Sequence, residues 1–170
     1  MVRRSVSRMV AAGISVFLAF APAGKAGADT TSANLTINVS VLSSANLTLG
    51  ANTLSFRAAD PITHPVIAAV ENPIPVIAKV RSNDPLTLLV IALDDLRNGD
   101  AVIPASAITW TAAGAPFMGG ALSKVSGQPA ARFPTGSGIY SSYFNFFLEN
   151  GAGYLPGTYS TTINYTLTTP

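Results

Sequence analysis

The chain contains no cysteine and only one histidine among its 170 residues. No disulfide can therefore staple the fold, and no thiol is available as a nucleophile. Structural and catalytic zinc sites use three or four His or Cys ligands, which His64 alone cannot supply. No serine stands in the G-x-S-x-G context of a hydrolase nucleophile. We therefore expect a protein that is not an enzyme, with no catalytic residues and no cofactor.

Charged residues are also scarce, at 11% of the chain, and they are scattered. Ten Lys and Arg against eight Asp and Glu give a formal net charge of +2. Four of the basic residues lie in the first 28, so loss of that segment would leave a net charge of −2. No basic patch remains, and nucleic acid is excluded as a partner because its binding needs such a patch.

The N-terminus has the three parts of a signal peptide. Three arginines among the first eight residues precede an apolar run at residues 9–20, and the small residues 26–28 (AGA) follow. An apolar run of this length is too short to span a bilayer, which takes about 20 residues. We predict a cleaved signal peptide at residues 1–28 and a single domain at residues 29–170. The mature chain would be exported to the cell surface, the periplasm or the medium, without membrane insertion.

Two segments near the ends of the mature chain alternate between apolar and polar residues. Residues 34–42 place four apolar side chains on one face: Leu35, Ile37, Val39 and Val41. Residues 159–167 also alternate, with one face formed by Tyr159, Thr161, Ile163, Tyr165 and Leu167. Thr161 is the one polar residue on that face. Since successive side chains of a strand point to opposite faces, both segments are predicted to be half-buried β-strands.

Turn signals separate further strand patterns between these two segments. Residues 74–81 alternate, residues 86–93 are almost all apolar as in a central strand, and residues 139–148 are rich in aromatics. Asn98-Gly99 is a hairpin signal, and residues 128–138 look like a loop. Seven to nine short strands without a helical period favour an all-β fold, an antiparallel β-sandwich, with a closed barrel as the alternative.

One group of oxygen-bearing side chains is a candidate calcium site: Asp94, Asp95, Asn98 and Asp100. Calcium takes six to eight oxygen ligands, but this spacing differs from D-x-[DN]-x-[DN]-G. A hairpin turn at Asn98-Gly99 accounts for part of the group. We therefore expect no metal here.

The aromatic strand at residues 139–148 leaves two alternatives open. The strand is covered on both faces, or Tyr143 and Phe147 form an exposed patch that contacts a protein or a glycan.

Both ends of the mature chain resemble known surface proteins. Residues 35–56 (LTINVSVLSSANLTLGANTLSF) are similar to the start of spore-coat-U and Csu-type pilin subunits, although the cysteines usual near the first break are missing. Residues 157–170 (GTYSTTINYTLTTP) resemble the terminal strand of those families. They also resemble the closing segment of WxL cell-surface domains, with residues 165–167 in the place of Trp-x-Leu.

The resemblance implies a bacterial immunoglobulin-like β-sandwich that serves as a fimbrial-like surface or adhesion subunit. Its partners would be other surface subunits or a second copy, joined by strand addition. The strand with Leu35, Ile37, Val39 and Val41 would be donated to a neighbour or pair within its own domain. A second hypothesis is a carbohydrate- or ligand-binding module in which Trp110, Tyr140 and Tyr143 stack on sugars.

The signal-peptide hypothesis predicts that the exported protein begins at Asp29. N-terminal sequencing of the protein recovered outside the cytoplasm checks this, and an intact Met1 would contradict it.

Overall fold

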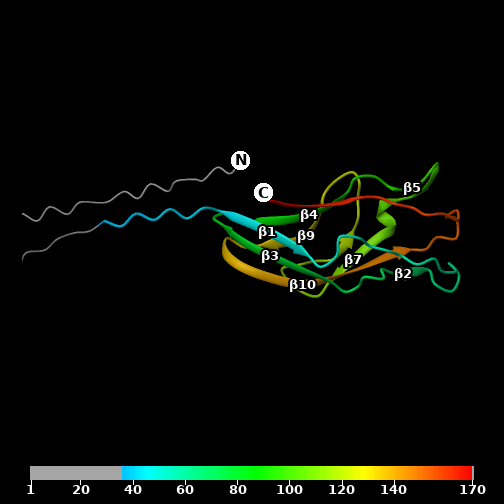
Figure 1. Ribbon diagram of the computed structural model, residues 1–170, viewed down its shortest axis with the longest axis horizontal. Coiled ribbons are helices and arrows are strands. Elements are labelled where there is room, and N and C mark those ends of the chain that lie inside the picture. The colour runs from blue at the N-terminus through cyan, green and yellow to red at the C-terminus, as the bar shows by residue number, and fades with distance from the viewer. Residues whose placement is uncertain (1–35, 170) are drawn as a thin grey trace, which may run out of the picture. The chain divides into compact units, whose positions relative to one another are not determined.

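The computed structural model describes residues 36–169 of the chain (Figure 1). The predicted signal peptide and Leu35 lie outside these residues. Spatial proximity divides the chain into two units, Met1–Val39 and Ser40–Pro170, and every described strand lies in the second. The fold is all-β, with eleven strands in the described residues and one short 3-10 helix, η1 (Ala105–Ala107).

The larger sheet has the strand order β1-β3-β10-β7-β8, and β2 also pairs with β10. Every pairing in it is antiparallel. Its strands are β1 (Ser44–Leu49), β2 (Val66–Ala68), β3 (Ile74–Ser82), β7 (Ile108–Ala112), β8 (Gly120–Ala121) and β10 (Gly136–Glu149). The long strand β10 is its centre, since β2 and β3 pair with one edge and β7 with the other.

The smaller sheet has the order β11-β4-β9 and is also antiparallel. Its strands are β4 (Leu86–Ala92), β9 (Gln128–Phe133) and β11 (Ile163–Thr168). A separate hairpin joins β5 (Leu96–Asn98) to β6 (Ala101–Ile103). This hairpin was predicted, but its two-residue loop is Gly99-Asp100, one residue later than expected. Gly99 takes a φ of 58°, which glycine adopts without strain.

The two sheets pack face to face around an aromatic core. Alternate residues of β3, β4 and β10 point inward, and Phe144 is fully buried. The ring of Phe117 lies edge-on between Phe133 and Phe144, with centroid distances of 5.6 and 5.8 Å. Edge-to-face contacts of this kind stabilise a core beyond the area that they bury. The prediction of an all-β antiparallel sandwich is confirmed.

Asn72 fills a gap in the larger sheet that the sequence did not predict. On one edge of β10, β3 ends opposite Phe144 and β2 begins opposite Phe147. Between them, the Asn72 side chain accepts a hydrogen bond from the Phe146 N–H at 2.9 Å and donates one to its carbonyl at 2.8 Å. The side-chain amide thus replaces a missing strand partner, and the buried backbone of Phe146 stays satisfied.

One side of the sandwich is closed by the loop between β7 and β8. Its Met118 N–H donates to the Ala130 carbonyl at 2.9 Å, and the Arg132 N–H donates back to Pro116 at 3.1 Å. The Trp110 indole N–H, from β7, donates to the Met118 carbonyl at 2.9 Å. The loop therefore links the larger sheet to β9 of the smaller one.

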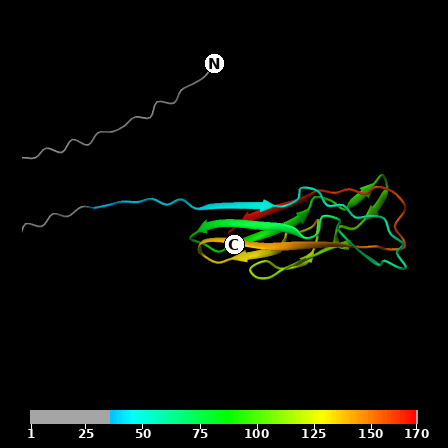
Figure 2. The same ribbon diagram turned by 60° about the horizontal axis from the view of Figure 1, so that its bottom comes forward.

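The opposite side of the sandwich lacks such a link among the described residues. There β1 pairs with β3 alone and β11 pairs with β4 alone, so both strands are sheet edges. Figures 1 and 2 both show β11 running close to β1. We call this pair of edge strands, β1 and β11, the open side.

Two predictions along the chain are wrong. Residues 36–42 were expected to form a strand, but residues 36–43 lie outside every strand, and the first strand begins at Ser44. Residues 128–138 were expected to be a loop, but β9 and the start of β10 lie there. Pro129 lies within β9, which is at the edge of its sheet, where the missing ladder donor of proline is tolerated.

Truncation of a side chain on the inner face of β10 should cost much more stability than truncation of one on its outer face. Phe144→Ala removes a fully buried ring and should lower the free energy of unfolding by about 3–5 kcal/mol. Ile139→Ala, on the same strand but 72% exposed, should change it by about 0.5 kcal/mol at most. Urea unfolding of both variants checks the assignment, and equal losses would contradict it.

Candidate interaction surfaces

The segment before β1 exposes a row of apolar side chains. Ile37, Val39 and Val41 are 76%, 79% and 64% exposed, and no residue of 36–43 belongs to a strand. These are three of the four interaction residues predicted in this segment; the fourth, Leu35, lies outside the described residues. Large apolar side chains in a row are rarely left in water unless they serve an interaction.

The open side is an incompletely covered part of the core. Leu47 and Leu49 of β1, and Ile163, Tyr165 and Leu167 of β11, pack against the core but stay only half-buried. The central strand β4 instead buries its inward residues, such as Leu88 and Val90. Burial still raises the pKa of the Tyr165 phenol to about 12, because an apolar environment disfavours its anion.

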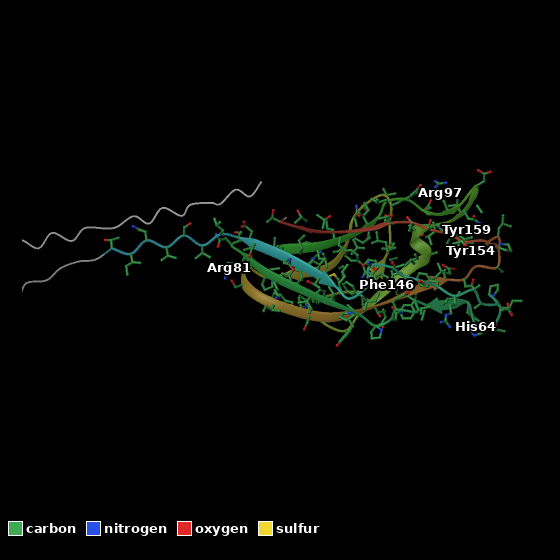
Figure 3. All side chains as sticks on the ribbon, viewed as in Figure 1. His64, Arg81, Arg97, Phe146, Tyr154 and Tyr159 are labelled. Carbon is green, nitrogen blue, oxygen red and sulfur yellow. The ribbon has the colours of Figure 1, made fainter. Side chains whose placement is uncertain are left out.

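The predicted alternation of residues 159–167 is confirmed, although β11 begins only at Ile163. The stretch before it is held by an isolated β-bridge between Ser160 and Arg97 and by side-chain hydrogen bonds. The Tyr159 hydroxyl donates to the Leu155 carbonyl at 2.8 Å, and the Thr161 hydroxyl donates to the Asp94 carbonyl at 2.7 Å. Figure 3 shows Tyr154, Tyr159 and Arg97 gathered at this end of the fold.

Two of the three carboxylates of the calcium candidate, Asp94 and Asp95, form ion pairs with cations of the chain. Asp94 pairs with Arg97 at 2.7 Å, and Asp95 pairs with Lys124 while accepting the Ala105 N–H at 2.9 Å. The Arg97 guanidinium and the Asp95 N–H lower the pKa of Asp94 to about 2. The Lys124 ammonium and the Ala105 N–H lower the pKa of Asp95.

Asn98 and Asp100, the other two members of the calcium candidate, belong to the β5–β6 hairpin and its turn. Within residues 36–169, no three His, Cys, Asp or Glu side chains are grouped as metal ligands would be. The arrangement in the described residues is an ion-pair cluster that fastens this hairpin to η1 and to the segment after β8.

Of the aromatics considered for ligand contact, Tyr143 alone presents its ring to solvent. Tyr143 is 50% exposed on the outer face of β10, and Phe147 on the same face is half-buried. Trp110 is buried, and Tyr140 packs against Phe133 with centroids 5.1 Å apart. Near Phe147 the outer face of β10 is thus partly covered, whereas at Tyr143 it is exposed.

The only histidine has no carboxylate as its hydrogen-bond partner. His64 is exposed, and its Nδ1 lies 2.9 Å from the hydroxyl of Thr63. Figure 3 shows His64 at the end of the domain where β2 lies.

The ion-pair cluster predicts a pH dependence of stability. The ordinary pKa of Asp94, 3.8, is lowered to about 2 by folding, so its contribution is full above about pH 4 and is lost as the pH falls through about 2. Urea midpoints measured from about pH 5 to about pH 2 should fall more for the wild type than for Asp94→Asn. Asp100→Asn, which removes an unpaired acid from the same hairpin, should follow the wild type. Parallel curves for the wild type and Asp94→Asn would contradict the assignment.

Comparison with protein-family models finds no match for the chain, and comparison with curated proteins finds none either. None of the described residues forms a helix that is both long and apolar enough to cross a membrane.

Proposed function

We propose that this protein is an exported, non-enzymatic, pilin- or coat-like surface subunit that joins copies of itself by strand addition. The segment with Leu35, Ile37, Val39 and Val41 is the donor, and the open side of a second copy is the acceptor. In this proposal the sandwich is immunoglobulin-like, and its place is the cell surface. The observation that carries the proposal is the exposed apolar row of residues 37–41 directly before an edge strand.

The donor has the pattern that an added strand requires. An added strand bonds through its backbone and is selected by alternate side chains. Ile37, Val39 and Val41 alternate with the polar residues Asn38 and Ser40. A proline, or a charge on the apolar face, would disfavour such pairing, and residues 36–43 contain neither.

The acceptor has an apolar surface that an added strand could cover. Leu47, Leu49, Tyr165 and Leu167 form an apolar surface that the described residues cover only in part. Full burial of three aliphatic donor side chains would contribute about 1.5–3 kcal/mol each. Association costs about 4–15 kcal/mol, so the three side chains offset a large part of it, and the backbone hydrogen bonds of the added strand contribute the rest.

A hairpin between the donor and its own β1 is disfavoured. The donor residue Val41 is separated from β1 only by Leu42 and Ser43. A two-residue hairpin prefers Asn, Asp or Gly, which adopt positive φ readily. Leu42-Ser43 lacks such residues, so the donor is disfavoured from folding back beside its own β1.

The sequence resemblance also supports the proposal. The two regions that resemble surface subunits, residues 35–56 and 157–170, contain the donor, β1 and β11. The parts used by the proposed assembly are therefore the parts that carry the resemblance.

Strand addition predicts that charges on the donor abolish assembly without unfolding the subunit. The double variant Ile37→Asp/Val39→Asp should remain monomeric, because both side chains must be buried in the complex and a buried unpaired carboxylate is costly. Its thermal midpoint should match that of the free subunit, since both residues are exposed. Light scattering coupled to size-exclusion chromatography at high protein concentration measures the mass.

The matched control is Asn38→Asp/Ser40→Asp, which adds the same charge to the opposite face of the donor. It should retain most of the assembly. Wild-type protein that stays monomeric at high concentration, or equal behaviour of the two double variants, would overturn the proposal.

A further inference from the structure

The outer face of the larger sheet is a surface that strand addition does not use. On β3 it carries Pro75, Ile77, Lys79 and Arg81, which alternate with buried residues. On β10 it carries Ser137, Ile139, Ser141, Tyr143, Asn145, Phe147 and Glu149. Lys79 and Arg81 bring positive charge to this face, and its one acidic residue among these, Glu149, lies at the other end of β10, opposite Val66 of β2.

A groove runs over the two cations. It has a volume of about 490 Å³ and lies across β1, β3 and β10. In the register of the strands, Arg81 lies between Ser44 and Ser137, and Lys79 lies between Asn46 and Ile139. Each cation is thus flanked by at least one hydroxyl or amide side chain that also lines the groove.

The cations in this groove are not neutralised by the chain. Among residues 36–169, the ion pairs involve Arg97 and Lys124, but neither Lys79 nor Arg81. Positive charge that forms no ion pair in the described residues and lines a groove is complementary to an anionic ligand.

A second groove lies along the same two strands. It has a volume of about 290 Å³, and Pro75, Ile77, Ser141 and Tyr143 line it. From Arg81 to Pro75 the strand advances roughly 20 Å at about 3.3 Å per residue. The face therefore offers two cations at one end and an exposed aromatic ring at the other, with hydroxyl groups between them.

We propose that this outer face binds an acidic polysaccharide. Carboxylates of the polymer bind Lys79 and Arg81, sugar hydroxyls bond to the flanking Ser and Asn side chains, and a further sugar lies against the ring of Tyr143. Binding here goes beyond strand addition, because it uses side chains of a sheet face and not the backbone of a sheet edge.

Other classes of ligand fit this face less well. A peptide added as a strand needs free backbone groups, but the residues of β3 here are paired with β1 and β10 on both sides. Nucleic acids and anionic membranes are bound by larger clusters of cations than these two. A chain of hydroxyls with spaced carboxylates matches the alternation of polar and cationic side chains.

The test uses the purified exported protein and polygalacturonate, a polymer of uronic acid, with dextran as the neutral polymer. Calorimetry at low salt should detect polygalacturonate and not dextran, and the affinity should fall as salt is raised. Lys79→Gln/Arg81→Gln should weaken binding at least tenfold. The matched control Arg57→Gln/Arg132→Gln removes two exposed arginines from elsewhere and should change it less than about threefold.

Tyr143 gives an independent arm of the test. Tyr143→Ala should weaken binding of the polymer severalfold. Tyr143→Phe keeps the ring and should bind the polymer with an affinity close to that of the wild type. Equal losses in the two charge variants, binding of dextran as tight as that of polygalacturonate, or no binding at low salt would overturn the proposal. Assembly measured by light scattering should be the same in Lys79→Gln/Arg81→Gln and the wild type. The test of polysaccharide binding can therefore fail while that of strand addition succeeds, and the reverse.

Discussion

The antiparallel pairing of β3 with β10 is the interaction on which the rest of the structure depends. It runs from Ser82 opposite Gly136 to Ile74 opposite Phe144. Its inner side chains form the wall on which the smaller sheet packs, and its outer side chains form the cationic face. Because a strand shows alternate residues to opposite sides, one pairing serves both purposes without conflict. Asn72 extends it by bonding to Phe146 where β3 ends.

The two sides of the sandwich are unlike each other, and this difference carries the functional argument. The loop before β8 bonds directly to β9, so the backbone groups at that side are largely used within the domain. At the open side, β1 and β11 each have one strand neighbour, and their inward residues are half-buried. An edge with unpaired backbone groups and apolar side chains is a template for another strand. The exposed side chains of Ile37, Val39 and Val41 have the apolar character that such an added strand needs.

Much of the fold could be predicted from the sequence because its strands alternate cleanly. The alternation of β3 and of residues 159–167, and the apolar run of β4, led to the correct elements. Residues 36–42 were predicted wrongly because alternation reports what a strand could bury, not whether a partner is present. The bonds of Asn72 to Phe146 and the pairing of Asp95 with Lys124 join residues distant in the chain, so no local pattern contains them.

Charged residues are scarce in this protein, so the few cations that it has can each be compared by their contacts. Arg97 and Lys124 are bound to Asp94 and Asp95, where they fasten a hairpin. Lys79 and Arg81 have no such role in the described residues, and no core contact requires a charge at these outward positions. Serine or threonine would suit a solvated strand equally well, as the outward residues of β1 and β10 show. These two outward cations, which have no partner among the described residues, are the contacts that the proposed acidic polysaccharide would use.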